Sequence, residues 1–224
     1  GVSIHNQFFR AAMDSLRPGG VQALVVSRFL LDAQDSATRL ALAKQARLLG
    51  AIRLPDTAFK ENARTSVVTD IIFLQKLTEA EQEEMGKAVD AYNSRPERDA
   101  IAERERRALA DKVPELVRTV EVKDPLGGER ITVNHYFRAN PQQIMGVLER
   151  SGSMQHGADV TVRLDDKNAL AGMLDEAIAR LPEGVMDMPD EALANTEARF
   201  KSLSDSLRIQ LAKEEPGHLK FDLD

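Results

Sequence analysis

The sequence predicts an α/β fold, the second half of a doubly wound sheet, from three observations in its first third. Apolar residues at helical spacing over residues 4–16 are followed by the turn Pro18-Gly19-Gly20. A nearly unbroken apolar run over 21–27 comes next and is typical of a strand buried on both faces of a sheet. Helix and strand patterns then continue to alternate as far as Lys76.

Each element of this first segment has a local signal. Ser3 is a suitable cap for the first helix, which the Pro-Gly-Gly turn ends. Asp35 or Ser36 can cap a second helix, which is predicted to continue to Gly50 because glycine commonly ends helices. The remaining apolar runs predict strands over 51–54 and 66–74.

The composition of the chain changes after residue 76. Thr78 and Glu81 form a capping box that opens a Glu-rich helix, and charged residues recur from 94 to 112 as on a solvated connecting helix. Beyond Pro114 the sequence predicts a hairpin of strands 120–122 and 131–133, short strands near 146–148 and 160–164, and helices over 166–181 and 190–213. The predicted organisation is an α/β segment (1–76), a charged helical connector (77–113) and an α+β C-terminal module (114–224).

The composition, 42% hydrophobic and 29% charged residues, is that of an ordinary globular protein. The absence of cysteine excludes disulfides and thiolate metal sites and fits a reducing compartment. No apolar stretch reaches the roughly 20 residues that span a bilayer, and the first residues lack the layout of a signal peptide. We therefore expect a cytoplasmic protein with no membrane partner.

The net charge of −6 is unevenly distributed along the chain. Through Lys76 there are ten Lys and Arg against six Asp and Glu, a net of +4, and the remainder holds twenty against thirty, a net of −10. A basic first third could lie against the phosphates of DNA. Ordinary solvated surfaces explain the same distribution, so both interpretations stay open.

Segments in the first third, taken in order and spacing, resemble the amino-methyltransferase family that modifies adenine in DNA. More narrowly, they resemble the large plasmid- and phage-borne methylases that are often joined to helicase modules. These segments cover residues 4–9, 16–21, 49–55, 58–60 and 65–76. Asn134-His135-Tyr136-Phe137 with Asn140-Pro141 is similar to a downstream segment of the same subgroup, whereas the acidic stretch between departs from it.

The resemblance implies the C-terminal half of a doubly wound methyltransferase sheet, followed by a mostly helical α+β appendix. The family transfers a methyl group from S-adenosylmethionine with a Gly-rich turn and an Asn or Asp followed by Pro-Pro and an aromatic. This chain has no Pro-Pro pair and no Gly-x-Gly. We therefore expect a cofactor-binding and catalytic half upstream of Ser3, no bound cofactor here and no methyl transfer by the chain alone.

The resemblance also implies a role for Phe59, because an aromatic before the family's last antiparallel strands stacks on the extruded adenine. An exocyclic amine cannot be reached inside the duplex, so the base must leave the stack and be held between flat surfaces. The alternative is a loop residue packed under the sheet edge. Lys60 and Arg64, on the same loop, could contact phosphates or be ordinary surface charges.

Ser27 and Arg28 lie at the carboxyl end of the first strand, at the sheet edge where open α/β sheets bind ligands. They could line the substrate cleft, or Ser27 could cap a helix. The four histidines lack metal-ligand spacing, and carboxylate pairs such as Asp165-Asp166 lie in polar stretches without a predicted shared site.

Three functional interpretations follow from the sequence. The first is a substrate-side fragment of a DNA adenine methyltransferase, with DNA, the missing half and a helicase module as partners, in restriction-modification or on a mobile element. The second is a non-catalytic DNA-binding or assembly module. The third is a half-domain ordered by self-association into a homo-oligomer, since half a doubly wound sheet has an open edge.

Overall fold

A computed structural model describes residues 11–59, 67–94, 108–124, 130–153 and 157–186 of the 224-residue chain. The chain divides into two compact units, residues 1–185 and 186–224. All elements described below belong to the first unit. Within the described residues, no helix is both long and apolar enough to cross a membrane.

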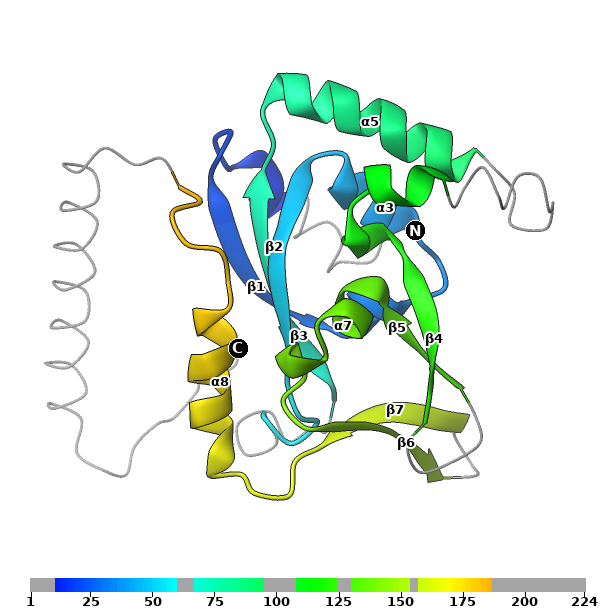
Figure 1. The fold of residues 1–224 in the computed structure, drawn as a ribbon, viewed down its shortest axis with the longest axis vertical. Helices are drawn as coiled ribbons and strands as arrows, with labels where there is room; N and C mark the ends of the chain where they lie inside the picture. Colours follow the sequence, from blue (N-terminus) through cyan, green and yellow to red (C-terminus); the bar gives the residue numbers. More distant parts are fainter. Residues whose placement is uncertain (1–10, 60–66, 95–107, 125–129, 154–156, 187–224) are drawn as a thin grey trace, which may run out of the picture. The chain divides into compact units, whose positions relative to one another are not determined.

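A three-stranded sheet forms the centre of this unit, with the strands in the order β1-β3-β2. The strands are β1 (Val21–Ser27), β2 (Ala46–Arg53) and β3 (Thr69–Lys76). β3 runs antiparallel to both neighbours, so β1 and β2 are parallel to each other (Figure 1). The register between β1 and β3 is regular from Val21 opposite Gln75 to Ser27 opposite Thr69.

The remaining elements are short helices and two antiparallel hairpins. Four helices contribute to the packing around the sheet or connect its strands: α2 (Phe29–Asp32), α3 (Ala37–Ala43), α5 (Glu79–Asn93) and α7 (His135–Ala139). The hairpins are β4 (Thr119–Lys123) with β5 (Arg130–Asn134), and β6 (Val147–Ser153) with β7 (Gly157–Arg163). Three 3-10 turns, η1 (Ala110–Lys112), η2 (Glu115–Val117) and η3 (Pro141–Gln143), and the helix α8 (Ala169–Ala179) complete the unit.

The two faces of the sheet contribute to two apolar clusters, because successive side chains of a strand point to opposite faces. Ile72 and Leu74 of β3 belong to the larger cluster, which includes buried residues of α3, α5 and α7. Ile71 and Phe73 pack against the smaller cluster, to which α8 contributes Ala177. The structure is therefore a mixed α/β fold with helical packing on both sides of the sheet.

The prediction of a strand over 21–27 is confirmed, but its expected burial on both faces is wrong. Ala23 is exposed on the face that carries Phe73 and Ile71, and Val25 is 56% exposed there. α8 packs over apolar residues of β2 and β3 on that face. The apolar run thus predicted the strand correctly, but it did not predict how much of the strand other elements cover.

The second predicted helix is too long. α3 ends at Ala43, and β2 begins at Ala46 and continues to Arg53, so residues 46–50 form strand rather than helix. Apolar residues over 46–52 fit either structure when the run is short. Pairing with β3, from Ala46 opposite Lys76 onward, determines the outcome. A register shift between Leu48 and Gly50 marks a bulge in this strand.

The later elements follow the predictions more closely. The hairpin β4–β5 is confirmed, and the strand candidates near 146–148 and 160–164 correspond to β6 and β7. α8 lies within the helix predicted over 166–181. The start of the first helix and the helix predicted over 190–213 lie outside the described residues.

The larger apolar cluster contains buried residues from all three predicted segments of the chain. Ile72 comes from the first, Val89 from the second and Phe137 from the third. These segments therefore share one core, and the boundaries at residues 76 and 113 stay predictions about domain organisation.

Gly146 lies immediately before β6 with a φ of +146°, a backbone conformation that side-chain-bearing residues rarely adopt. A Cβ atom at this position would contact the backbone carbonyl of Arg163, with its carbon 3.0 Å away. The close approach of two backbone segments therefore requires glycine here.

The capping box of α5 has the predicted geometry and supports a stability prediction. The Glu81 backbone N–H donates to the Thr78 hydroxyl at 3.3 Å, and the Thr78 backbone N–H donates to the Glu81 carboxylate at 2.9 Å. Thr78→Ala is expected to lower the free energy of unfolding by about 0.5–2 kcal/mol in urea titrations at neutral pH.

This effect is expected to depend on pH. The backbone N–H and the hydroxyl of Thr78 both donate to the Glu81 carboxylate, each at 2.9 Å, and these two hydrogen bonds lower the pKa of Glu81, with a smaller contribution from Arg47. A carboxyl whose pKa is lowered on folding stabilises above its unfolded pKa, about 4.3 for Glu, and loses that contribution as the pH falls through the lowered value. The difference between wild type and Thr78→Ala should shrink in acid. A pH-independent difference would contradict the role of the Glu81 charge.

Candidate functional site at the carboxyl ends of β1 and β2

The carboxyl ends of β1 and β2 meet at one edge of the sheet because the two strands are parallel. Ser27 is the last residue of β1 and Arg28 follows it, and the turn 56–59, which carries Phe59, comes after β2. The structure therefore brings the three predicted substrate-side residues to the same edge. This is the edge where open α/β sheets place their ligands.

Beneath this edge lies a buried network of four charged side chains. Arg53 donates from Nε and Nη2 to the two carboxylate oxygens of Asp70, at 2.7 and 2.8 Å. Its Nη1 lies 2.8 Å from Oδ2 of Asp32, whose same oxygen lies 3.7 Å from Nη1 of Arg28. The side chains of Arg53 and Asp70 are fully buried, and Asp32 and Arg28 are nearly so.

Backbone and aromatic contacts from the third predicted segment complete the network. Asn134 donates its backbone N–H to Oδ1 of Asp32 at 2.9 Å, and its side-chain amide donates to the carbonyls of Leu31 and Leu116. The guanidinium carbon of Arg53 lies 4.2 Å from the centre of the Phe137 ring, a cation–π contact. Segments that lie far apart in sequence thus hold one buried site.

Burial and pairing act in opposite directions on these charges. Burial alone would lower the pKa of Arg53, but the two carboxylates of Asp70 and Asp32 outweigh it and raise that pKa. Burial raises the pKa of the Asp70 carboxyl, and the bidentate bond from Arg53 acts against that rise. The Arg53 guanidinium stays charged, so it acts as a paired cation that fixes the strand ends.

The network was not predicted from the sequence, although a signal was present. Arg53 is the only charged residue in the run 48–55, and Asp70 is the only one in the run 65–75. A single charge of opposite sign in each of two apolar runs suggests paired strands with a buried ion pair. Asp32 gave no comparable signal because it lies in a short helix beside polar residues.

Ser27 and Arg28 contribute to this edge in different ways. Ser27 is exposed, and its hydroxyl accepts a hydrogen bond from the backbone N–H of Phe29 at 3.5 Å, but the N-cap of α2 is Arg28 and no side chain caps this helix. Arg28 is 9% exposed and pairs with Asp32. Ser27 is therefore not the cap of α2, the Arg28 guanidinium is mostly buried, and substrate contacts by either residue stay a prediction.

Phe59 is partly buried and packs against the smaller apolar cluster, which contains Ile52, Leu54, Met145 and Ala177. This contact fits the interpretation of a loop residue packed beside the sheet, and its stacking role stays a prediction. Lys60 and Arg64, the predicted DNA contacts, lie outside the described residues.

A different aromatic side chain is exposed at this edge. Phe29, the first residue of α2, is 56% exposed, and the guanidinium carbon of Arg28 lies 4.2 Å from its ring centre. Val25 and Val67 are also exposed, at 56% and 46%. Arg28 donates its backbone N–H to the carbonyl of Val68, which joins the start of α2 to the segment before β3.

Two cavities of the described region lie at the opposite edge, where β2 begins and β3 ends. One, of about 490 Å³, is lined by residues including Gly19, Gln75 and Lys76, and the other, of about 540 Å³, by residues including Met85 and Pro114. Arg47 and Glu81, an ion pair at 2.9 Å, line both. Neither cavity is lined by a predicted substrate residue.

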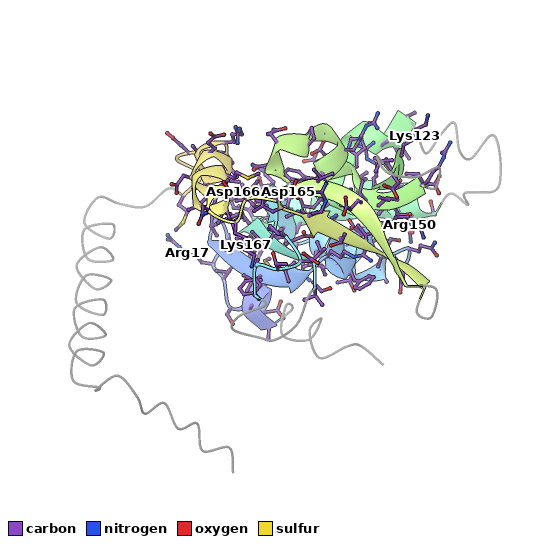
Figure 2. All side chains as sticks on the ribbon, turned by 90° about the horizontal axis from the view of Figure 1, so that it is seen from below. Arg17, Lys123, Arg150, Asp165, Asp166 and Lys167 are labelled. Atoms are coloured by element: carbon purple, nitrogen blue, oxygen red, sulfur yellow. The ribbon has the colours of Figure 1, made fainter. Side chains whose placement is uncertain are left out.

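The acidic residues of the described region do not form a metal site. No group of three or more His, Asp or Glu side chains among residues with a described position could hold an ion. Asp165 and Asp166 project with Lys167 from the turn between β7 and α8 (Figure 2). The Asp165 carboxylate is 77% exposed and pairs with Arg163, in agreement with its interpretation as a solvated residue.

Comparisons with protein-family models, with curated proteins and with solved structures find no match to this chain.

Proposed function

We propose that this chain supplies the substrate-side part of a DNA adenine methyltransferase. The observation that carries the proposal is the convergence of Ser27, Arg28 and the Phe59 turn at the shared carboxyl edge of β1 and β2. In the proposed enzyme, residues outside this chain bind S-adenosylmethionine and polarise the adenine amine.

The strand arrangement supports this proposal. The family that the sequence resembles ends its sheet with antiparallel strands, and here the last strand, β3, is antiparallel to β1 and β2 and lies between them. The buried pairing of Arg53 with Asp70 and Asp32 fixes the ends of these strands. A fixed edge suits a surface that must position a base within a fraction of an ångström.

The chemistry expected of this edge is binding and orientation of an extruded base. Phe59 supplies a ring for stacking, and the exposed hydroxyl of Ser27 can donate to or accept from a polar edge of the base. Methyl transfer itself requires groups that the chain does not contain, since it has neither the Pro-Pro motif nor the Gly-rich turn.

A DNA-binding experiment tests the proposal. The chain should bind a labelled duplex with an unpaired adenine more tightly than the fully paired duplex, because extrusion then costs less. Phe59→Leu should remove this preference, by a factor that corresponds to a stacking energy of about 1–3 kcal/mol, because leucine keeps the apolar packing but has no ring. Fluorescence anisotropy titrations measure both affinities.

Phe59→Tyr is the matched control, since it keeps a ring and should keep the preference. Equal binding of both duplexes by the wild-type chain would contradict the base-handling role. Incubation with S-adenosylmethionine and adenine-containing DNA should give no methyl transfer. Methylation by the chain alone would show that its catalytic groups lie within these residues.

A second candidate function is a non-catalytic DNA-binding or assembly module. The packing of Phe59 against the smaller apolar cluster favours it, because a packed ring has less surface for a base. This function predicts salt-sensitive binding to DNA without preference for an unpaired adenine. The same titrations therefore separate the two candidates.

A further inference from the structure

We propose that the outer edge of β1 pairs with the same edge of a second copy of this chain, so that the two sheets join across a twofold axis. The observation that carries the inference is an unpaired, uncharged strand whose free backbone groups match those of an inverted copy of itself. The inference goes beyond the proposed function and does not rest on it, because it concerns the length of the strand rather than the residues at its carboxyl end.

β1 is an outer strand of the sheet, and only one of its edges is paired (Figure 1). The Arg28 backbone N–H donates to the carbonyl of Val68, and the Lys76 backbone N–H donates to the carbonyl of Gly20, so the even-numbered residues face β3. Hydrogen-bonded positions alternate along an antiparallel pair, and this pair has a regular register. The residues whose N–H and C=O groups point away from β3 are therefore Val21, Ala23, Val25 and Ser27.

These outward groups determine what kind of partner fits. Within the part of the chain that the structure describes, no backbone hydrogen bond reaches them. A row of free N–H and C=O groups at alternate residues matches the backbone of another extended strand, which presents the complementary groups at the same spacing. The edge of β1 is therefore a site for strand addition.

β1 lacks the features that usually prevent strand addition. Protected edges carry charged residues, proline or a bulge. Residues 21–27 contain no charged residue, no proline and no glycine, whereas each of the other described strands contains at least one charged residue. The opposite outer strand, β2, carries Arg47 and Arg53, has a bulge after Leu48, and forms a bridge from Arg53 to Ile144. Of the two edges of this sheet, only that of β1 is left open to pairing.

A second copy of β1 is the occupant that this edge fits. In an antiparallel pair centred on Leu24, Val21 lies opposite Ser27 of the other copy, and Ala23 lies opposite Val25. The outward groups at all four positions then meet outward groups, and no like charges face each other because the strand has none. Such a contact uses the same surface on both copies, so it closes at a dimer and leaves neither β1 edge free.

The exposed side chains of β1 support the same arrangement. Ala23 and Val25 are exposed and lie on one face of the strand, because they are two residues apart. In the dimer each Val25 has Ala23 of the other copy as its cross-strand neighbour, which covers apolar surface that is exposed in one copy alone. A single pair of strands is a small interface, so we expect a dimer that dissociates on dilution.

Sedimentation velocity over a range of protein concentrations tests the inference. The wild-type chain should convert from monomer to dimer as its concentration rises. Val25→Lys should stay monomeric at concentrations where the wild type is dimeric, because it places a charge on the edge, and the fold should tolerate it since Val25 is 56% exposed. Ile178→Lys is the matched control, since Ile178 is 53% exposed on α8 and the same change there should leave the dimer intact.

Disulfide cross-linking tests the register, because the chain has no cysteine of its own. Leu24→Cys should form a disulfide between copies under mild oxidation, since Leu24 lies opposite itself with the two Cα atoms about 4.5 Å apart. Gln22→Cys is the control on the same face of the strand. Its two copies would lie about 13 Å apart along the pair, at about 3.3 Å per residue, and should not cross-link.

Three results would overturn the inference. A wild-type chain that is monomeric at every concentration would leave this edge to a strand of a different protein. A dimer that Val25→Lys leaves unchanged would have its interface elsewhere on the chain. Equal cross-linking of Leu24→Cys and Gln22→Cys would contradict the antiparallel pairing centred on Leu24. Each of these results leaves the DNA-binding test of the proposed function unaffected.

Discussion

Arg53→Met is expected to lower the free energy of unfolding by about 3–5 kcal/mol, the typical result of removing one partner from a buried ion pair. The side chain of Arg53 is fully buried and pairs with two carboxylates, so its loss leaves Asp70 without its bidentate partner and Asp32 without its nearest cation. Methionine is close in volume and apolar, so the missing charge rather than a cavity causes the loss. Urea titration followed by circular dichroism measures it.

Two further variants identify the cause. Arg53→Lys keeps a positive charge but cannot make the bidentate contact to Asp70, so it should recover only part of the stability. Asp70→Leu combined with Arg53→Met removes both charges of the closest pair and should be more stable than Arg53→Met alone. A loss below about 1 kcal/mol in Arg53→Met, the range of an exposed pair, would contradict the buried network.

Gly146→Ala is expected to destabilise the fold. Backbone strain contributes about 1–3 kcal/mol, and the contact of the added methyl group adds to it. The φ of +146° disfavours alanine, and the added methyl group would contact the backbone carbonyl of Arg163 rather than a side chain that could rotate away. Either the start of β6 must move or its pairing with β7 must loosen. Thermal unfolding of the variant measures the loss.

Gly172→Ala provides the matched control for this substitution. Gly172 lies inside α8, and a methyl group added there would meet nothing within 4 Å, so alanine should stabilise this helix by about 0.5–1 kcal/mol. The same chemical change thus has opposite expected signs at two positions of one chain. A neutral Gly146→Ala would show that the carbonyl of Arg163 yields to the added methyl group.

The elements predicted best are those whose bounds are determined by residues that are neighbours in sequence. Pro18-Gly19-Gly20 ends one element, and the following apolar run gives β1 with its correct bounds. The capping box of Thr78 and Glu81 likewise marks the start of α5. In both places the residues that determine the structure are neighbours in sequence, so no tertiary contact is needed to recognise them.

The predictions were wrong where contacts between residues far apart in sequence determine the structure. Residues 46–50 have a pattern that fits a helix or a strand, and only their pairing with β3 makes them a strand. Val25 is exposed because α8 packs over β2 and β3, and no local sequence pattern indicates which strands α8 covers. Both cases are contacts between segments that lie far apart along the chain.

The candidate site was predicted only in outline. The rule that ligands bind at the carboxyl edge of the sheet indicated Ser27 and Arg28, and the strand directions bring Phe59, which only the resemblance indicated, to the same edge. The ion network and the exposure of Phe29 were not predicted, because both depend on which side chains the fold buries. The resemblance gave a role to Phe59 and no indication of Phe29.

Asn134 has a consequence for experiments that divide this chain. Its amides bind a carboxylate and two carbonyls that belong to the regions on either side of residue 113. A chain that ends at residue 113 would lack the hydrogen bond from Asn134 to the carboxylate of Asp32 and the Phe137 ring that contacts Arg53. Deletion mapping that treats the later region as a removable attachment would therefore report misfolding as loss of activity.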